Sequence, residues 1–376
     1  MSTHAGASPR GGLSLGLPDR VRDRMQDIAS QLAAAGGLIL VAILLTIASP
    51  YFLTSNNLFN IGVQVSIVAI IAVGQTLVIL TGGIDLSVGA VAGLGGILGT
   101  MAIAKAGLPI AVGILIAVLA GAFIGFVNGV LVTQMKLPPF IATLGMLGVC
   151  SGLPFIVGGE NAVYGLPSGF RLFGEGQIGP IPLPILYLIV IAVAGHVILK
   201  RTKLGRYAYA IGSNQEAARL SGIALNRYLI VIYMIPAALA GFGGMIAASL
   251  VHSGQPNYGN GLELNVIAAC VIGGASLFGG VGTIGGTMIG AFLMAVITNG
   301  AVLLNITQYY QEVIIGVIIW LAVWWDQVRR RRLSAASEQM GRRKADGDGD
   351  GDDGGEPGGG ARGGGSRAEP GSAHAS

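Results

Sequence analysis

One acidic and one hydroxyl side chain directly follow a pair of glycines in an otherwise apolar stretch. Residues 73–96 read VGQTLVILTGGIDLSVGAVAGLGG, so Asp85 and Ser87 come just after Gly82 and Gly83. Paired glycines interrupt a helix, because each tolerates positive φ and costs about 1 kcal/mol in a helix interior. Irregular backbone at membrane depth occurs only where protein or a water-filled cavity covers it. The segment is therefore either a tight turn between helices or a broken helix beside a transport pathway.

Two interpretations of Asp85 fit the residues. Acids inside membrane segments are candidates for function, and a proton- or sodium-coupled carrier would use Asp85 as its coupling carboxylate. Alternatively, Asp85 caps the helix that starts near Leu86, close to the cytoplasmic face. The apolar stretch holds no basic partner and no second acid. The sequence favours the cap.

Catalytic and phosphate-binding motifs are missing from this sequence. It has no GxxxxGK[ST] loop to bind ATP phosphates, no HExxH and no histidine cluster. Its two cysteines, Cys150 and Cys270, both lie in apolar segments and have no metal-ligand spacing. We therefore expect no catalytic residues, no metal site and no cofactor.

Composition indicates a membrane protein. Charged residues make up 11% of the 376 residues and hydrophobic residues 52%, whereas a soluble domain is about 25% charged. Between Leu38 and Leu199 the only Lys or Arg residues are Lys105, Lys136 and Arg171, each at or beyond the end of an apolar run. The net charge of +4 is confined to short flanks, so it does not indicate binding to nucleic acid.

Apolar runs near the required length of about 20 residues predict an all-α polytopic membrane protein with about ten transmembrane helices. The third and eighth runs are short and interrupted by glycine, which in transporters indicates a binding or gating site. The predicted spans are Gly36–Phe52, Phe59–Leu80, Val88–Ala104, Leu108–Val132, Phe140–Val157, Pro182–Leu199, Tyr228–Val251, Leu264–Ser276, Thr283–Asn305 and Glu312–Trp325.

Charge predicts the orientation of these spans. Residues 200–227 hold six basic side chains and one acid, and the flank after the last span holds Arg329 to Arg332. Basic flanks mark cytoplasmic ends, so both termini and the 200–227 loop are expected inside. The loops Gly158–Ile181 and His252–Glu263 then lie outside.

The chain divides into three predicted regions. Residues 1–35 form a polar cytoplasmic tail without the pattern of a cleavable signal peptide. Residues 36–326 form the transmembrane domain. Residues 327–376 form a basic flank and a Gly/Asp-rich tail, which is expected to be disordered because it has almost no apolar side chains to bury.

The 200–227 loop contains the signature of a short capped helix, about Asn214 to Ser221. Ser213 and Glu216 have the spacing of a capping box, in which each side chain bonds the other residue's backbone amide. Gly222 stands where a left-handed C-terminal cap belongs. The helix would present Ala217, Ala218 and Leu220, either as a connector packed on its own bundle or as a dock for a partner.

Four segments resemble the sugar-type permease subunits of bacterial ABC importers, the ribose/xylose/galactose group within the branched-chain amino acid/ribose permease superfamily. The resemblance covers about Leu38 to Asp326. The matching segments are GQTLVILTGGIDLSVG, VNGVLVTQMKLPPFIATLG (Val127–Gly145), GRYAYAIGSNQEAARLSGI (Gly205–Ile223) and ELNVIAACVIGGASLFGGVGTIGG (Glu263–Gly286).

The resemblance implies a function and partners. Glu216-Ala217-Ala218, three residues and then Gly222 are similar to the EAA–x3–G motif, whose short helix docks on a separate cytoplasmic ATPase subunit. The family's Ile-x-Leu-Pro appears only loosely, at Met234-Ile235-Pro236. A homodimer of permeases in the lipid of the bacterial inner membrane would import a monosaccharide delivered by an extracytoplasmic binding protein. Related permeases for branched-chain amino acids, nucleosides or signalling furanones share this architecture, so they remain alternatives.

A sugar pathway needs amide and hydroxyl groups, and several occur inside the apolar runs. An unpartnered buried group costs a few kcal/mol, so most should bond one another across helices and a minority should line the pathway. The candidates besides Gly82, Gly83, Asp85 and Ser87 are Gln75, Asn128, Thr143, Asn265, Ser276 and Asn299.

Two glycine patterns concern packing and symmetry. Gly121, Gly125 and Gly129 recur every fourth residue, a spacing that lets helices approach closely.

Asn128-Gly129 is echoed at Asn299-Gly300, 171 residues further on. The two copies would have opposite orientations in the membrane, so an inverted repeat is compatible with the sequence but not required by it.

Overall fold

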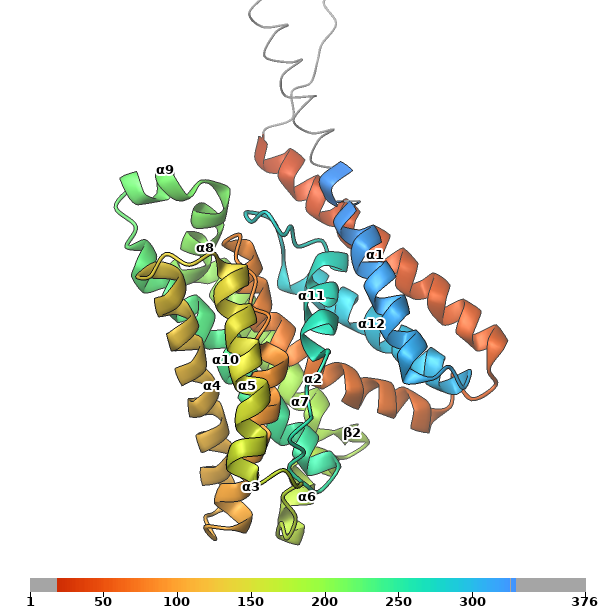
Figure 1. Ribbon diagram of the computed structural model, residues 1–376. Coiled ribbons are helices and arrows are strands. Elements are labelled where there is room, and N and C mark those ends of the chain that lie inside the picture. The colour runs from red at the N-terminus through yellow and green to blue at the C-terminus, as the bar shows by residue number, and fades with distance from the viewer. Residues whose placement is uncertain (1–18, 325, 329–376) are drawn as a thin grey trace, which may run out of the picture. The chain divides into compact units, whose positions relative to one another are not determined.

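The computed structural model describes residues 19–324 and 326–328, with side chains from residue 31 onward. It is almost entirely helical, as expected (Figure 1). Contacts divide the chain after Trp325 into two units, and of the second only 326–328 are described. The tail predicted to be disordered lies outside the described residues.

Eight helices in the described residues are long and apolar enough to cross a membrane, and two shorter apolar helices, α3 and α11, bring the number of apolar segments to the ten predicted. The apolar helices are α1 (Asp19–Ala48), α2 (Ser55–Leu80), α3 (Val88–Ala104), α4 (Ile110–Thr133), α5 (Pro139–Gly158), α7 (Leu183–Arg201), α10 (Leu225–Leu250), α11 (Leu262–Ile272), α12 (Ile284–Leu303) and a last helix over 308–324.

The remaining elements are short and lie outside the apolar helices. Between α5 and α7 come η1 (Ser168–Phe170), α6 (Arg171–Glu175) and a two-residue hairpin of β1 (Gln177–Ile178) and β2 (Ile181–Pro182). Between α7 and α10 come α8 (Lys203–Ser213) and α9 (Gln215–Leu220). The sequence predicted only the second of these two helices.

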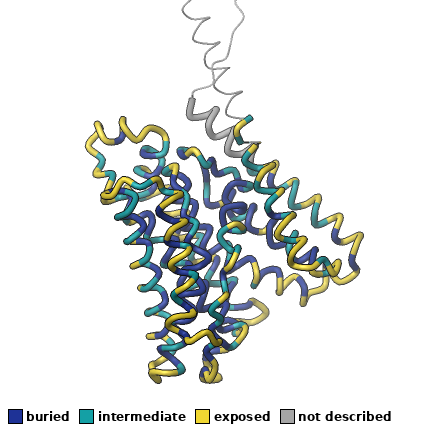
Figure 2. Tube along the Cα trace, in the orientation of Figure 1, coloured by how far each residue is buried: buried dark blue, intermediate teal, exposed yellow. Residues whose placement is uncertain are grey.

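Helix α10 is the centre of the packing, since it contacts α4, α3 and α2. Helix α2 in turn contacts α7, α11 and α12, and α1 packs on α12. The buried residues therefore concentrate in the interior helices, while the outer helices expose large apolar side chains (Figure 2). Examples are Ile47 of α1, Phe123 of α4 and Val190 of α7. This is the pattern of a bundle whose outer face lies against lipid.

Glycine allows α4 and α10 to pack backbone to backbone. A Cβ added at Gly121 would meet the Ala237 carbonyl, and one at Gly125 would lie 2.7 Å from the Cα of Met234. A Cβ at Gly129 would lie 2.6 Å from the Cα of Ile230. The expected packing role of this glycine stripe is confirmed within one chain.

Each half of the bundle contains one broken segment. Residues 81–87 separate α2 from α3, and residues 273–283 separate α11 from α12. The inverted repeat itself stays a prediction. Asn128 and Asn299, which the repeat would equate, make different contacts, since Asn128 donates to Ser87 and Asn299 pairs with Asn57.

Candidate functional site

The first break begins where α2 ends at Leu80. Gly82 adopts φ of +78°, a left-handed conformation that costs glycine little and other residues more. Its N–H donates to the Ile79 carbonyl, 2.9 Å away, which satisfies one of the last carbonyls of the helix. A Cβ added at Gly83 would collide with the hydroxyl of Tyr233 from α10. The glycine pair therefore both turns the chain and makes room for a neighbouring aromatic ring.

Asp85 is fully buried in this break, and its carboxylate organises the start of α3. Its Oδ1 accepts from the backbone N–H of Ser87 at 2.8 Å and from the Ser87 hydroxyl at 2.7 Å. Ser87 is the N-cap residue of α3 but makes no side-chain cap bond of its own. This geometry favours the cap interpretation of Asp85 over a coupling role.

Three further predicted residues gather around the same break. The Asn128 amide of α4 donates to the Ser87 hydroxyl at 2.9 Å, and the Gln75 amide of α2 donates to the Asp85 carbonyl at 3.3 Å. The Thr143 hydroxyl of α5 donates to the Ile84 carbonyl at 3.1 Å. The structure therefore brings five candidates from separate elements into one buried polar cluster: Gln75, Asp85, Ser87, Asn128 and Thr143.

The cluster retains unused hydrogen-bonding capacity. Among the described residues, four buried side-chain atoms have no partner, and three of them are Gln75 Oε1, Asn128 Oδ1 and the Tyr233 hydroxyl. Unpaired buried groups are rare because each costs about 1–3 kcal/mol, so they indicate a functional position. Sequence reasoning missed Tyr233. The available signal was a phenol inside an apolar span, where it requires a polar partner.

A cavity of about 530 Å³ opens beside the first break. Gly82, Gly83 and Tyr233 line it on one side, and Gln215, the first residue of α9, lines it on another. The first break and the start of α9 therefore border the same cavity.

The second break approaches the first. Gly274 takes φ of +92°, and the segment continues through Ser276, whose N–H donates to the Val281 carbonyl at 2.9 Å. The N–H of Gly280 donates to the carbonyl of Leu80, the last residue of α2, at 2.9 Å. Two breaks that are far apart in sequence are therefore in direct contact.

Two candidates lie away from this cluster. Asn299 of α12 exchanges two hydrogen bonds with Asn57 of α2, at 2.8 and 3.0 Å, so the two amides satisfy each other. Asn265 of α11 is half-buried and donates only to the Gly261 carbonyl at 3.4 Å. The structure does not bring either residue to the breaks.

The predicted short helix exists as α9, but its capping differs from the prediction. The N-cap is Asn214, whose Oδ1 accepts from the N–H of Ala217 at 2.9 Å. The capping box with Ser213 is wrong, because α8 extends through Ser213 and moves the start of α9 one residue on.

The charged side chains of α9 pair with each other. Instead of reaching back to the N-cap, Glu216 forms a two-pronged ion pair with Arg219, with the shorter N–O distance 2.6 Å. This bond lowers the pKa of Glu216. At the other end Gly222 has the expected positive φ, +81°. Leu220 is 75% exposed, so the helix presents an apolar side chain to its surroundings.

Helix α8 was missed although its signal is present. Leu204, Ala208 and Ile211 recur at helical spacing, and Ala208 and Ile211 are buried. Thr202 caps the helix by accepting from the N–H of Gly205 at 3.5 Å. The basic residues around the helix suggested an exposed charged loop, so this helical periodicity was not used to predict α8.

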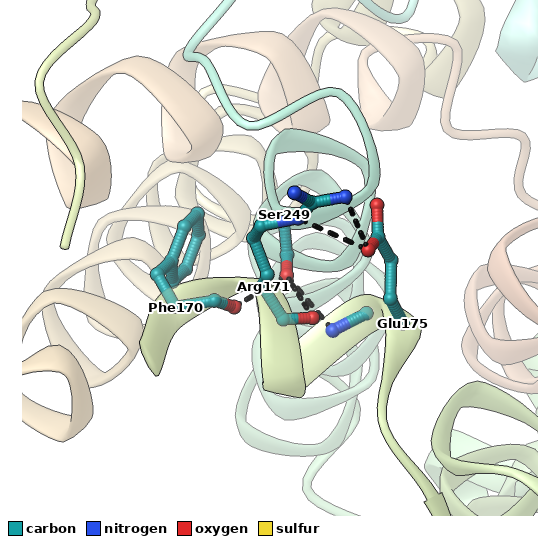
Figure 3. A network of polar contacts seen from close by, with 5 residues as sticks. Phe170, Arg171, Glu175 and Ser249 are labelled. Atoms are coloured by element: carbon teal, nitrogen blue, oxygen red, sulfur yellow. Dashed lines mark hydrogen bonds and ion pairs between the residues drawn. The ribbon is translucent and has the colours of Figure 1, made fainter. Parts of the chain in front are cut away.

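At the opposite end of the bundle, two loops are joined together. Val163 and Gly254 form an antiparallel bridge that links residues 158–181 to residues 252–263. Ser249 of α10 donates to the Phe170 carbonyl at 2.6 Å and accepts from the N–H of Gly174 at 2.8 Å (Figure 3).

One ion pair lies on the exposed side of this network. Arg171 and Glu175, four residues apart on α6, approach to 2.8 Å (Figure 3). Both side chains are largely exposed, so the pair contributes little to stability. The loop network is therefore held by the buried Ser249 and presents charged groups at its surface.

Comparison with known proteins identifies the family. Residues 57–323 match the model of the branched-chain amino acid transport system permease component. This chain belongs to that permease family. The match includes both breaks, α8 and α9, so the cluster around Asp85 and the exposed helix lie inside the shared part of the fold.

Several curated relatives resemble the chain over most of its length. The ribose import permease RbsC of Escherichia coli K12 is 43% identical, covering 78% of this chain and 92% of the relative. RbsC of Bacillus subtilis is 39% identical over 82% and 96%. The D-allose permease AlsC of E. coli K12 is 36% identical over 77% and 89%. No solved structure matches the chain.

In this chain, the described residues contain no arrangement of side chains typical of a catalytic site. No group of three or more His, Cys, Asp or Glu side chains in the described part could hold a metal. Cys150 and Cys270 are both buried and unpaired. The polar groups that the fold brings together bond to one another and to the backbone of the first break.

Proposed function

We propose that this chain is the membrane-spanning subunit of an ATP-binding-cassette importer for a monosaccharide. Transport would be driven by a separate cytoplasmic ATPase subunit, and the chain itself would catalyse no reaction and need no cofactor. The observation that carries the proposal is α9, a short capped helix that protrudes from one end of the bundle (Figure 1). The motif Glu216-Ala217-Ala218 with Gly222 lies on it.

The surroundings of α9 suit a docking role. A surface groove of about 480 Å³ runs between α8 and α9 and is lined by Tyr207, Asn214 and Ala217, among others. Ala218 is buried with Ile211 and Leu229 in a small core, which fixes α9 to α8 and α10. A fixed helix with an exposed apolar tip can receive a partner and pass on its movement.

Sugar as the substrate class rests on the relatives, whose names specify ribose import and D-allose transport. The buried cluster at the first break adds chemical support, because amides and hydroxyls suit an uncharged polyol. Among the candidates, Gln75 and Asn128 have unused carbonyl oxygens, and Tyr233 has an unused hydroxyl. Branched-chain amino acids, nucleosides and furanones are weaker candidates for the same fold.

We place the chain in the bacterial inner membrane with both termini in the cytoplasm. The basic residues of 200–227 put α8 and α9 on the cytoplasmic side. The bridged loops 158–181 and 252–263 then face outward, where they would receive the sugar-binding protein.

A second copy of the chain would complete the transporter. Helix α5 has Gly145, Gly148 and Gly152 with no heavy atom within 4 Å of an added Cβ, so this face has open space. Small residues are typical of helix contacts in membranes. Lipid would cover the remaining exposed apolar faces of α1, α4 and α7.

Co-purification tests the docking helix. The tagged chain is expressed with its partner ATPase and extracted in mild detergent, as wild type and as Gly222→Asp, which forces a branched side chain into φ of +81° at the dock. Gly107→Asp is the matched control, because Gly107 also has positive φ (+66°) and open space but lies in the loop between α3 and α4, at the opposite end of the bundle.

We expect the ATPase to co-purify with wild type and Gly107→Asp and to be lost from Gly222→Asp. If no ATPase binds the wild type and the chain carries solute into liposomes without ATP, the importer proposal is wrong. An ion-coupled carrier using Asp85 would then be the alternative.

A further inference from the structure

Helix α8 touches both broken segments at one point. A Cβ added at Gly212 of α8 would meet the Leu80 carbonyl and would lie 2.6 Å from the N–H nitrogen of Gly280. From the other side, a Cβ at Gly279 would lie 2.8 Å from the nitrogen of Gly82. Backbone from α8, the first break and the second break therefore meets without intervening side chains, as only glycine allows.

Hydrogen bonds join the three segments. The N–H of Gly280 donates to the carbonyl of Leu80 at 2.9 Å, which ties the second break to the end of α2. The Tyr209 hydroxyl of α8 donates to the Gly282 carbonyl at 2.6 Å, which ties α8 to the residue before the N-cap of α12. Thr283, that N-cap, accepts from the N–H of Gly286 at 3.0 Å and from the Gln31 amide of α1 at 2.9 Å.

Helix α8 also shares a packed core with α9. Ile211 shares a small core with Ala218 of α9, while Ala208, one turn earlier, belongs to a core with Val78 and Leu80 of α2. Packed helices switch between discrete positions instead of deforming continuously, so a displacement at one end of α8 is transmitted to its other end.

We propose that Tyr209 and Gly212 form a transmission joint, through which displacement of α9 by the ATPase reaches both broken segments at once. Tyr209 acts as a positioning residue, since it contacts the backbone of the second break rather than the solute. The inference rests on the proposed docking function of α9. Coupling would then also require the hydrogen bond from the Tyr209 hydroxyl to the Gly282 carbonyl, which lies outside the docking helix.

The test measures coupling in the complete transporter: permease, ATPase and binding protein in liposomes. Tyr209→Phe keeps the ring and removes only the hydroxyl that bonds the Gly282 carbonyl. We expect the ATPase to remain bound, and the sugar imported per ATP hydrolysed to fall about threefold to tenfold, the effect of losing one hydrogen bond. Gly212→Ala adds a Cβ that would clash with the backbone of Leu80 and Gly280, and it should reduce the ratio of sugar imported to ATP hydrolysed at least as much.

Tyr228→Phe is the matched control. Tyr228 of α10 packs edge-on against Tyr207 of α8, with ring centroids 4.6 Å apart. Within the described part of the chain, the Tyr228 hydroxyl makes no hydrogen bond. Its import-to-hydrolysis ratio should equal that of wild type. A merely structural role for Tyr209 would lower the thermal midpoint and leave this ratio unchanged.

The outcomes separate this inference from the proposed function. If the wild type shows no ATP-driven import, the proposed function fails and the joint has no role. If the wild type is coupled and Tyr209→Phe matches it, the joint is refuted. Loss of ATPase binding in Tyr209→Phe, or failure of both Tyr209→Phe and Gly212→Ala to fold, would also refute it, because Tyr209 and Gly212 would then be structural.

Discussion

Substitution of Asp85 distinguishes a structural carboxylate from an ion-coupling one. Its Oδ1 accepts both the backbone N–H and the hydroxyl of Ser87, whereas its other oxygen has only a 3.5 Å approach from the Asn128 amide. Asp85→Asn keeps one carbonyl oxygen in the position of Oδ1 and removes the negative charge. Asp85→Ala removes both acceptors and leaves two buried donors of Ser87 without a partner.

The expected free-energy changes follow from these contacts. Each stranded buried donor costs about 1–3 kcal/mol, so the two donors stranded in Asp85→Ala should cost about 2–6 kcal/mol. Asp85→Asn retains both bonds with a neutral acceptor and should lose about 1 kcal/mol. Since 1 kcal/mol shifts Tm by roughly 2 °C in a chain of this size, the Ala variant should melt roughly 4–12 °C lower.

The assay combines thermal unfolding in detergent with ATP-driven uptake in liposomes. We expect Asp85→Asn to retain most of the uptake and Asp85→Ala to lose stability and uptake together. The cap role would be refuted by an Asp85→Asn protein that is as stable as wild type, binds its ATPase and carries no sugar. That result would give the Asp85 carboxylate a role in the transport step itself.

Three further outcomes are expected. Gly125→Leu should abolish folding, because even a Cβ there would lie 2.7 Å from backbone of α10; yield of monodisperse protein measures this. Asn57→Ala and Asn299→Ala should each lower Tm without changing the import ratio, and the double variant should show a coupling of about 1 kcal/mol. Asn214→Ala should weaken ATPase binding by removing an N-cap worth about 1 kcal/mol, whereas Ser213→Ala should not.

Each of these outcomes has a result that contradicts it. For the packing prediction, Gly36→Ala on the exposed face of α1 is the control, because nothing lies within 4 Å of the added Cβ. Equal yields of Gly36→Ala and Gly125→Leu would contradict the packing prediction. A change in sugar transport for Asn299→Ala at unchanged Tm would return that residue to the pathway. Stronger loss of ATPase binding in Ser213→Ala than in Asn214→Ala would restore the capping box.

Much of the fold could be predicted from the sequence because the signals are local. Apolar runs predicted all ten apolar segments within a few residues at most ends, and the glycine pair Gly82-Gly83 marked the first break. The main shortfall was α1, which begins at Asp19 rather than at Gly36. Polar residues 19–35 lack the hydropathy of a span, but hydropathy does not predict where a helix begins.

The candidate site was predicted only in part. Gln75, Asp85 and Asn128 were identified as buried polar positions, since such residues are expensive anywhere in an apolar run. The pairing of Asn299 with Asn57, 242 residues away, could not be predicted, because any amide in the chain could have been its partner. Tyr233 was missed although the sequence shows a phenol inside an apolar span.

What the sequence by itself determined was therefore the set of membrane segments, their interruptions and the exposed helix before Gly222. Hydropathy, glycine conformation and capping depend on neighbours in the chain, so one sequence is sufficient to predict them. Only the tertiary structure decided that α8 meets both breaks through Gly212 and Tyr209. Those contacts join residues more than 70 positions apart, and their formation depends on how the helices pack in three dimensions.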